Sequence, residues 1–494
     1  MGKIGFVVYL LALAAMGAHA TPEAEHDARQ ALAGMEVPRG VACVPDCGDG
    51  DLALELTRQS DFLVLAMDAD AENVAVAKAK AADAGLLGRR LYVEQGSTGA
   101  IPFADNYVDL LVLSDVPEKD LSPELRAEIL RVLTPIRGRA VLADTTIQKP
   151  EMHGSDWWTH KLHGPNNNQV SEDTAFEFPP ILQFRAMPAY SSNVGSALTA
   201  RGIHIEINDW VHQNVYRAGL CGRIFARSSY NGRIFWQGTV PEGVEADLPL
   251  FAIAGGDLLL ASGERAEVLR RDLQTGTERQ GIVLAGDEMR IKWLAVEDGS
   301  LFVLLGAPSE VRTPFESLRQ WDVYKRQETG RTLFGSTLIA WDMAEGFTQW
   351  EHREPAKISF RNVAVYQGRL YFYSEGKRLG CLDAKTGRQI WENADGEWME
   401  TEKRPTRFRY SNIRNPSTLK VSDGLVLLSL VEGGKGFVFR AEDGALAHRI
   451  KHPKGLSYEA QKSLILNGKC YIGGEALDAA AGWRTGHDQL PSLA

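Results

Sequence analysis

A strand–turn–strand pattern that recurs along the C-terminal part of the chain constrains the fold most strongly. Its clearest copy is Leu379–Glu392, LGCLDAKTGRQIWE, in which apolar residues flank the turn Thr386-Gly387. Glycine supplies the positive φ that such a turn needs. Six turns of this kind align on their glycines, which are Gly232, Gly276, Gly346, Gly387, Gly444 and Gly482. The repetition predicts an array of similar β-units.

Two other residues recur at fixed distances from these glycines. An Asp lies four residues before the glycine in four copies, and a Trp lies four residues after it in three. They are Asp272, Asp342, Asp383 and Asp478, and Trp236, Trp350 and Trp391. The Asp can accept hydrogen bonds from the N–H groups of its turn, and the Trp offers a flat face on which the next repeat can dock. We therefore expect the three Trp residues at equivalent positions.

A glycine-led apolar strand precedes each turn, as at Gly368-Arg-Leu-Tyr-Phe. Successive turn glycines are 44, 70, 41, 57 and 38 residues apart, and three of these intervals approach the ~40–50 residues of a four-stranded blade. The pattern resembles the pyrroloquinoline quinone (PQQ)-type repeat of quinoprotein-like β-propellers, A-x-D-x-x-T-G-x-x-x-W. The resemblance covers about residues 190–494 and implies an all-β propeller of six to eight blades. Unrelated hairpins in a β-sandwich are the alternative.

Strands and helices alternate over residues 38–144, which predicts a doubly wound parallel α/β sheet. The expected strands are Gly40–Pro45, Phe62–Met67, Leu91–Glu94, Val108–Leu113 and Ala140–Ala143, and the expected helices are Leu52–Gln59, Ala71–Ala84 and Pro123–Leu133. The segment resembles a class I S-adenosylmethionine (SAM) methyltransferase with a Rossmann-like fold. In that family a glycine-rich turn, an acidic residue after the second strand and a polar residue after the third contact the cofactor. The resemblance implies that Asp46, Gly48, Gly50, Asp68 and Ser97 are the cofactor-binding residues.

Four departures from the family pattern argue that SAM binds weakly or not at all. Val44 stands where an acidic residue is usual, and Asp46 replaces the first glycine of the turn. A Cβ and a negative charge at that position would crowd the cofactor. The Pro-Gly-Gly turn before the fifth strand has become Pro135-Ile-Arg-Gly138, and no closing antiparallel strand pair is expected after Asp144. We identify no catalytic residue.

Residues 1–20 have the three parts of a secretory signal. Lys3 precedes the apolar run Ile4–Met16, and Ala18-His19-Ala20 forms an A-x-A cleavage site before Thr21. The run is too short for a transmembrane helix, which needs ~20 residues. We expect an exported, periplasmic or extracellular protein with no membrane span after signal removal; a buried N-terminal helix is the alternative.

The chain thus divides into a signal peptide (1–20), a methyltransferase-like domain (38–145), a linker that leads into the repeats (146–190) and a PQQ-like propeller (191–494). In the linker, His160 and His163 could bind a metal if the segment is helical, but no third ligand is evident and packing is favoured. In the propeller, the basic run Glu402–Tyr410 could bind an anion, although a solvated loop is favoured.

Composition narrows the possible functions. The formal net charge of −10 argues against a nucleic-acid partner. Five cysteines form no CxxC or zinc pattern, although Cys43 and Cys47 could approach each other. A vicinal cysteine pair and a Ca²⁺-ligand set usually mark quinoprotein dehydrogenases, and neither is evident, so PQQ is not expected. The hypotheses are a scaffold that binds an unknown ligand or protein on the propeller face, an active SAM methyltransferase, and a PQQ-dependent dehydrogenase.

The signal pattern predicts that the mature protein begins at or near Thr21. Edman sequencing or intact mass of the protein recovered outside the cytoplasm measures this directly. Recovery of the chain from the cytoplasm with Met1 intact would contradict export.

Overall fold

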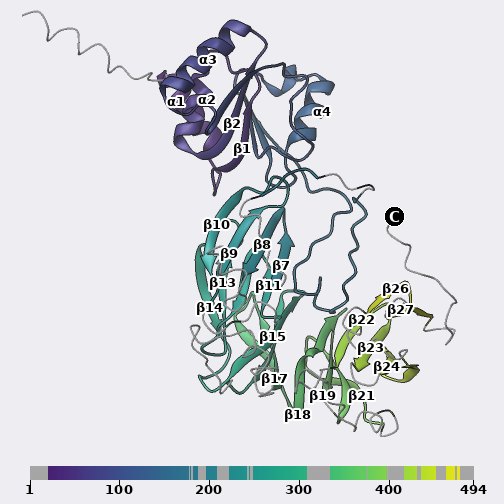
Figure 1. Cartoon of the computed structure of the whole chain (residues 1–494). Coiled ribbons are helices and arrows are strands. Elements are labelled where there is room, and N and C mark those ends of the chain that lie inside the picture. Colours follow the sequence, from purple (N-terminus) through teal and green to yellow (C-terminus); the bar gives the residue numbers. More distant parts are fainter. Residues whose placement is uncertain are drawn as a thin grey trace, which may run out of the picture.

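The computed structural model describes residues 21–176, 179, 182–186, 196–208, 222–241, 244, 249–308, 334–374, 376–395, 398, 417–430, 435–451, 463–472 and 475–478. An α/β domain lies at one end, and the β-sheets of the repeats lie beyond it (Figure 1). Four sequence features lie outside the described residues, namely the signal 1–20, Cys221, the run Glu402–Tyr410 and Gly482. Among the residues described, no helix has the length and apolarity to cross a membrane.

The α/β domain is built on a six-stranded sheet in the order β3-β2-β1-β4-β5-β6. Its strands are β1 (Arg39–Val44), β2 (Asp61–Asp68), β3 (Leu91–Gln95), β4 (Leu110–Leu113), β5 (Arg139–Leu142) and β6 (Thr146–Gln148). Its helices are α1 (Pro22–Leu32), α2 (Asp51–Gln59), α3 (Ala71–Asp83) and α4 (Pro123–Val132), with a short 3₁₀ turn, η1 (Glu118–Asp120). The first five strands are parallel, and the elements expected from the sequence lie within two residues of these bounds.

Two elements of this domain were not expected. Helix α1 begins after Thr21, whose hydroxyl accepts the N–H of Ala24, and its alanine face packs against α2. Strand β6 pairs antiparallel with β5, so the sheet is mixed. The sequence predicted no closing antiparallel strand pair after Asp144, and the described residues contain one such strand of three residues, which is too short to leave a period-two pattern.

The repeat strands form five sheets in the described residues. The first sheet consists of β7 (Ser196–Ala200), β8 (Ile203–Asn208), β9 (Arg223–Ser228) and β10 (Ile234–Thr239). The second sheet consists of β11 (Phe251–Ala254), β12 (Asp257–Ala261), β13 (Glu267–Asp272) and β14 (Glu278–Val283). The third has seven strands, β15 (Arg290–Glu297), β16 (Ser300–Gly306), β17 (Phe334–Asp342), β18 (Phe347–Tyr366), β19 (Arg369–Ser374), β20 (Arg378–Asp383) and β21 (Gln389–Asn393). The fourth sheet consists of β22 (Thr418–Ser422), β23 (Leu425–Leu430), β24 (Lys435–Arg440) and β25 (Leu446–Lys451). The fifth consists of β26 (Leu464–Leu466), β27 (Lys469–Ile472) and β28 (Glu475–Asp478).

Six repeat units can be distinguished in these sheets. Strand β18 serves two of them, because its first part pairs with β17 and its last part, Val363–Tyr366, pairs with β19. The expected glycine-led strands are the second strands of the six units. Each follows a two-residue turn with positive φ at both residues, the geometry of a tight type I′ hairpin. The turns are Arg201-Gly202, Gly255-Gly256, Asp298-Gly299, Gln367-Gly368, Asp423-Gly424 and Asn467-Gly468.

The three repeat tryptophans occupy equivalent positions, as predicted. The indole N–H of each donates to a carbonyl of the next unit, from Trp236 to Leu273, from Trp350 to Ala384 and from Trp391 to Ala441, at 2.9, 2.8 and 3.0 Å. The rings cover the turn glycines of those units, Gly276, Gly387 and Gly444. The Trp therefore joins one repeat to the next, by burial of its face and by one hydrogen bond to the turn.

The turn aspartates act as the spacing predicts. Asp272 Oδ1 accepts the N–H groups of Gln274 and Thr275, at 2.9 and 2.7 Å. Asp342 and Asp383 make equivalent bonds in their own turns. In the first unit the hydroxyl of Ser228 takes the place of the carboxylate.

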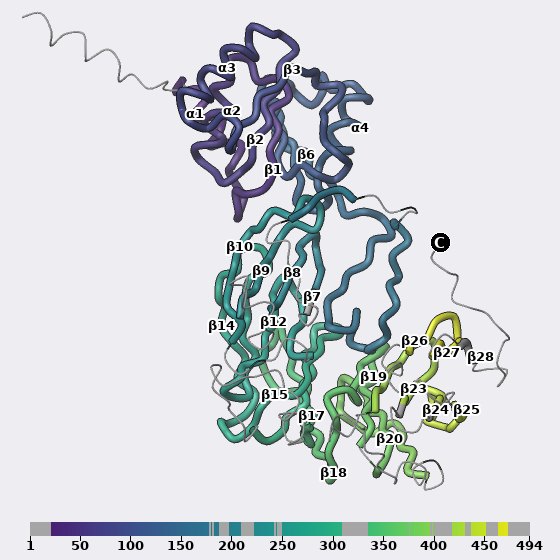
Figure 2. Tube along the Cα trace, in the orientation of Figure 1, coloured from purple at the N-terminus to yellow at the C-terminus, as the bar shows by residue number. Residues whose placement is uncertain are grey.

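An extended part of the linker, residues 158–168, contacts the first strand of every unit. Its backbone carbonyls at Trp158, Thr159, Pro165 and Asn166 accept N–H groups of β7, β11, β18 and β22. The His160 side chain accepts the N–H of Val296, and the Asn167 side chain donates to the carbonyls of Val363 and Leu419. The Asn168 side chain bonds both backbone groups of Ile465. We call residues 158–168 the axial segment; Figure 2 shows it descending from the α/β domain beside the sheets. It brings together strands almost 270 residues apart in the chain.

The two domains meet at the first repeat unit. Asn231, in the turn before β10, donates to the carbonyl of Tyr107 and to Oδ2 of Asp109, at 2.9 and 2.8 Å. Asp109 is fully buried and also accepts the N–H of Val41 at 2.9 Å. Burial raises the pKa of Asp109, while the charge of Arg137 and these hydrogen bonds act in the opposite direction. The interface therefore contains a satisfied but costly buried carboxyl group.

Two turn glycines offer a matched test of the Trp contact. Both have positive φ, 68° at Gly387 and 75° at Gly346, so alanine costs about 1–2 kcal/mol at either from backbone strain alone. A Cβ at Gly387 would lie 2.6 Å from the ring of Trp350, whereas one at Gly346 would meet no atom within 4 Å. We expect Gly387→Ala to lower the free energy of unfolding by a further ~1–3 kcal/mol. Equal losses for Gly387→Ala and Gly346→Ala in urea denaturation would contradict the contact.

Candidate functional site

The candidate cofactor residues gather at the carboxyl ends of β1 and β2. Asp68 ends β2 and is 4% exposed. Its Oδ2 accepts the N–H of Gly48 at 2.9 Å, and its Oδ1 accepts that of Asp70 at 2.8 Å. The N–H of Gly96 donates to the backbone carbonyl of Asp68 at 3.0 Å, which brings the end of β3 to the same edge. Ser97, next in the chain, is exposed and its carbonyl accepts the N–H of Ala100.

The two turn glycines have different physical roles. Gly50 has φ of 85°, and a Cβ there would lie 2.6 Å from the Cβ of Ala77 on α3. Gly50 is therefore required for the close approach of α3 to the loop. Gly48 has φ of 52°, and a Cβ there would meet no atom within 4 Å. Of these two glycines, only Gly48 has open space beside its backbone.

Asp46 and Asp68 form a carboxyl pair at this edge. Asp46 is exposed, and its carboxyl group lies near enough to that of Asp68 for the two to interact electrostatically. Desolvation raises the pKa of Asp46, and the charges of Asp68 and Asp115 raise it further. Burial also raises the pKa of Asp68, but hydrogen bonds from the Asp70 amide, Asn73, the Gly48 amide and Asp46 outweigh burial and lower it overall. The two carboxyl groups therefore titrate as a coupled pair, with the pKa of Asp46 raised and that of Asp68 lowered.

The start of α2 carries further carboxylates. Lys80 Nζ lies 2.7 Å from Oδ2 of Asp49 and 2.5 Å from Oδ1 of Asp51. The N–H of Thr21 donates to the other oxygen of Asp51 at 3.1 Å. This helix N-terminus, which would otherwise favour an external anion, is therefore occupied by the protein's own carboxylates.

Sequence reasoning missed Asn73 and Lys80, which help to fix this edge. Both lie on α3, which the sequence predicted as a helix with no functional motif. Their roles depend on how α3 packs beside the loop, and no local pattern encodes that packing. The signal that could have drawn attention to Lys80 is the excess of aspartates at residues 46–51, which requires a counter-charge.

The linker histidines do not form a metal site. His160 and His163 pair with each other as a β-bridge, so the segment is not helical. Nε2 of His160 accepts the N–H of Val296 at 3.0 Å, and burial, with the charge of His163, lowers the pKa of His160 to about 3. Nε2 of His163 lies 2.7 Å from Oδ2 of Asp156. Across the described ranges no three His, Cys, Asp or Glu residues are placed to hold a metal ion.

Cys43 and Cys47 are buried free thiols. Burial raises the pKa of both, that of Cys47 to about 12. Neither is therefore a reactive thiolate at neutral pH.

Comparison with known families matches two separate segments of the chain. The family described as "Methyltransferase domain" matches residues 46–136. The family described as "Outer membrane protein assembly factor BamB" matches residues 334–482. A comparison with curated proteins returned no match.

Solved structures similar to the chain fall into the same two groups. A Methanococcus maripaludis protein assigned as an SAM-dependent methyltransferase is 28% identical, with 24% of this chain and 55% of that chain covered and a TM-score of 0.23. A geranyl diphosphate C-methyltransferase from Streptomyces coelicolor A3(2) is 17% identical, with 24% of this chain and 43% of that chain covered and a TM-score of 0.22. BamB from Moraxella catarrhalis is 14% identical, with 57% of this chain and 66% of that chain covered and a TM-score of 0.34. The chain spans about half the length of these methyltransferases and two thirds of that BamB chain.

The two family matches coincide with the two kinds of sheet described above. Residues 46–136 cover the strands β2–β4 and the turn at Gly48 and Gly50. Residues 334–482 cover the repeats with Trp350 and Trp391. The chain thus carries a class I SAM methyltransferase-like α/β domain fused to a PQQ-type, BamB-like repeat domain.

Proposed function

We propose that this is an exported two-domain protein in which the repeat domain is a binding or scaffold module. In this proposal the methyltransferase-like domain has lost methyl transfer and is retained as a rigid attachment. The observation that carries the proposal is the Asp46–Asp68 carboxyl pair at the edge where the family binds its cofactor.

The fit of SAM to this edge is poor for electrostatic reasons. SAM carries a carboxylate beside its ammonium and sulfonium groups, and where that carboxylate lies nearest Asp46 the two negative charges oppose each other by about 1–4 kcal/mol at ~4 Å, depending on screening. Both oxygens of Asp68 already accept backbone N–H groups from Gly48 and Asp70. The open space beside Gly48 supports some residual access, so the expectation is weak binding.

Export is supported by two observations besides the signal pattern. Cleavage after Ala20 would turn the amide of Thr21 into an α-ammonium group, 3.1 Å from Oδ2 of the buried Asp51. An ammonium at that distance would strengthen the hydrogen bond, because donor and acceptor would both be charged. The BamB family, by its description, belongs to outer-membrane assembly, and an envelope location agrees with that.

The proposed binding role of the repeat domain is supported by the bonds that the axial segment makes. The axial segment already bonds the first strand of each unit, so the faces and turn loops are left for an external ligand or protein. We propose a small ligand or a protein as the partner. A nucleic acid is disfavoured, because the formal net charge is −10.

Two other functions are tested alongside this one. An active SAM methyltransferase, whose repeat domain selects the substrate, is favoured by Gly48, Gly50 and Asp68 lying at one sheet edge. A PQQ-dependent dehydrogenase is disfavoured, because His160 and His163 in the axial segment bond to protein groups. The dehydrogenase function is tested by adding PQQ, Ca²⁺ and an alcohol and measuring the reduction of a dye.

We expect calorimetry with SAM to show a dissociation constant in the millimolar range or no binding. The charge on Asp46 is the cause in this proposal, so Asp46→Gly should tighten binding by at least tenfold, equivalent to about 1.4 kcal/mol. Asp49→Gly is the matched control, because Asp49 is bonded to Lys80. A low-micromolar constant in the parent, abolished by Asp68→Ala, would instead establish an active cofactor site.

The carboxyl pair makes a separate prediction that needs no cofactor. Because the charge of Asp68 raises the pKa of Asp46, Asp68→Asn should lower the pKa of Asp46 measured by ¹³C NMR of its carboxyl carbon. Desolvation should keep part of the upward shift in that variant. Asp49→Asn should leave the pKa of Asp46 unchanged, and an equal fall in both variants would show that the two carboxyl groups are not paired.

A further inference from the structure

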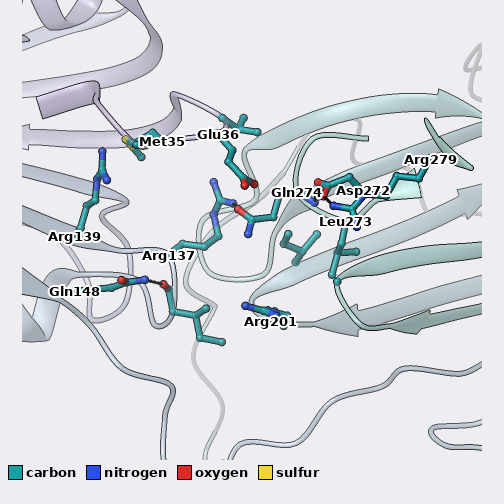
Figure 3. Close-up of a pocket in the computed structure, with 15 residues that line it drawn as sticks. Met35, Glu36, Arg137, Arg139, Gln148, Arg201, Asp272, Leu273, Gln274 and Arg279 are labelled. Carbon is teal, nitrogen blue, oxygen red and sulfur yellow. Dashed lines mark hydrogen bonds and ion pairs between the residues drawn. The ribbon is translucent and has the colours of Figure 1, made fainter. Parts of the chain in front are cut away.

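A pocket of about 420 Å³ lies between the α/β domain and the repeat domain (Figure 3). The α/β domain contributes the loop 34–37, the turn 136–139 and Gln148, and the repeat domain contributes residues around Arg201 and Asp272. Four arginines and two carboxylates line it, which are Arg137, Arg139, Arg201 and Arg279, and Glu36 and Asp272. The lining therefore has an excess of positive charge and is separate from the edge that carries Asp68.

Arg137 occupies the turn that departs from the methyltransferase pattern. In Pro135-Ile-Arg-Gly138, Ile136 has φ of 67°, a left-handed conformation that a β-branched residue adopts only under constraint. The guanidinium of Arg137 lies 3.9 Å above the ring centroid of Phe235. Its Nη1 donates to Oε1 of Gln274 at 3.1 Å, and its Nε is shielded from solvent without a hydrogen-bond partner. Such strain and an unpaired buried donor are common at binding sites.

The other arginines differ in how far the protein itself uses them. Arg279 is paired with Asp257 and Asp272. Arg139 donates to the carbonyls of Ala31 and Ala33. Arg201, by contrast, is exposed in the turn between β7 and β8 and has no acidic partner in the described part of the chain. Figure 3 shows Arg137 and Arg201 entering the pocket from the two domains.

The rest of the lining indicates what kind of molecule the arginines would face. Its apolar side chains are Met35, Val37, Ile136, Ile203 and Leu273. The volume lies within the range of pockets that hold small molecules. Arginine pairs with carboxylate or phosphate through parallel N–H bonds, and the apolar residues would contact a hydrocarbon body.

We propose that this interdomain pocket binds a small organic anion, whose carboxylate or phosphate group is held by Arg137 and Arg201. A purely structural role for Arg137, as the counter-charge of the buried Asp109, is the competing explanation. That role accounts for the position of Arg137. It leaves unexplained the pocket itself and Arg201, which has no acidic partner among the described residues.

Phenyl phosphate, benzoate and inorganic phosphate are suitable probes for calorimetry and thermal shift on the whole mature protein. The two aromatic probes separate a phosphate from a carboxylate preference, and inorganic phosphate measures the headgroup alone. We expect saturable binding of at least one aromatic probe, tighter than that of inorganic phosphate, and a concentration-dependent rise in Tm.

Arg201→Gln is the decisive variant, because Arg201 is exposed and forms no ion pair with any residue that the structure describes. It should weaken the bound probe at least tenfold, and Arg137→Gln should weaken it further if that variant folds. Arg353→Gln is the matched control, because the Arg353 side chain is 80% exposed and lies outside the pocket lining. Absence of saturable binding by all three probes, or equal affinity in the parent and Arg201→Gln, would overturn the proposal.

Discussion

The repeat domain depends on hydrogen bonds from the axial segment, an extended stretch of the linker that belongs to none of the sheets. The axial segment offers carbonyls and side chains to the first strand of each unit, groups that would otherwise be unpaired at a sheet edge. In an ordinary repeat array each unit contacts only its neighbours. Here a segment that precedes all the units also contacts all of them, so the array has long-range order that pairwise docking would not supply.

Docking between neighbours is the second source of that order, and it is uneven. Trp236, Trp350 and Trp391 cover the turn of the following unit. The unit that contains Gly276 has no Trp four residues later, and the next turn glycine, Gly346, has open space at its Cβ position. The unit that contains Gly276 therefore lacks the Trp contact to the turn of the next unit, and the described residues there are joined by the axial segment through Thr159 and His160.

The first turn is used differently, because it contacts the α/β domain. Asn231 in that turn bonds the buried Asp109, and Phe235 on the next strand stacks against Arg137. The interface therefore holds one buried carboxyl group and one partly buried guanidinium group, both of which need defined partners. This requirement fixes how the domains meet, and the arginine-lined pocket beside them is a consequence. The methyltransferase-like fold persists while its cofactor edge carries an added carboxylate, which illustrates that backbone topology and site chemistry vary separately.

The sequence alone determined the elements whose signals are local. Period-two strands, the alternation of strands and helices over residues 38–144, the glycine turns and the spacing of Asp272 and Trp350 from them could all be read without coordinates. Helix α1 and strand β6 were missed, since α1 buries only small alanines and β6 has three residues. Only the tertiary structure decided the role of His160, whose apparent ligand spacing with His163 proved to be a hairpin bonded to Val296. The tertiary structure also decided the pairing of Asp46 with Asp68 and the placement of Arg137 and Arg201 in the lining of one pocket, because each brings together residues that are distant in the chain.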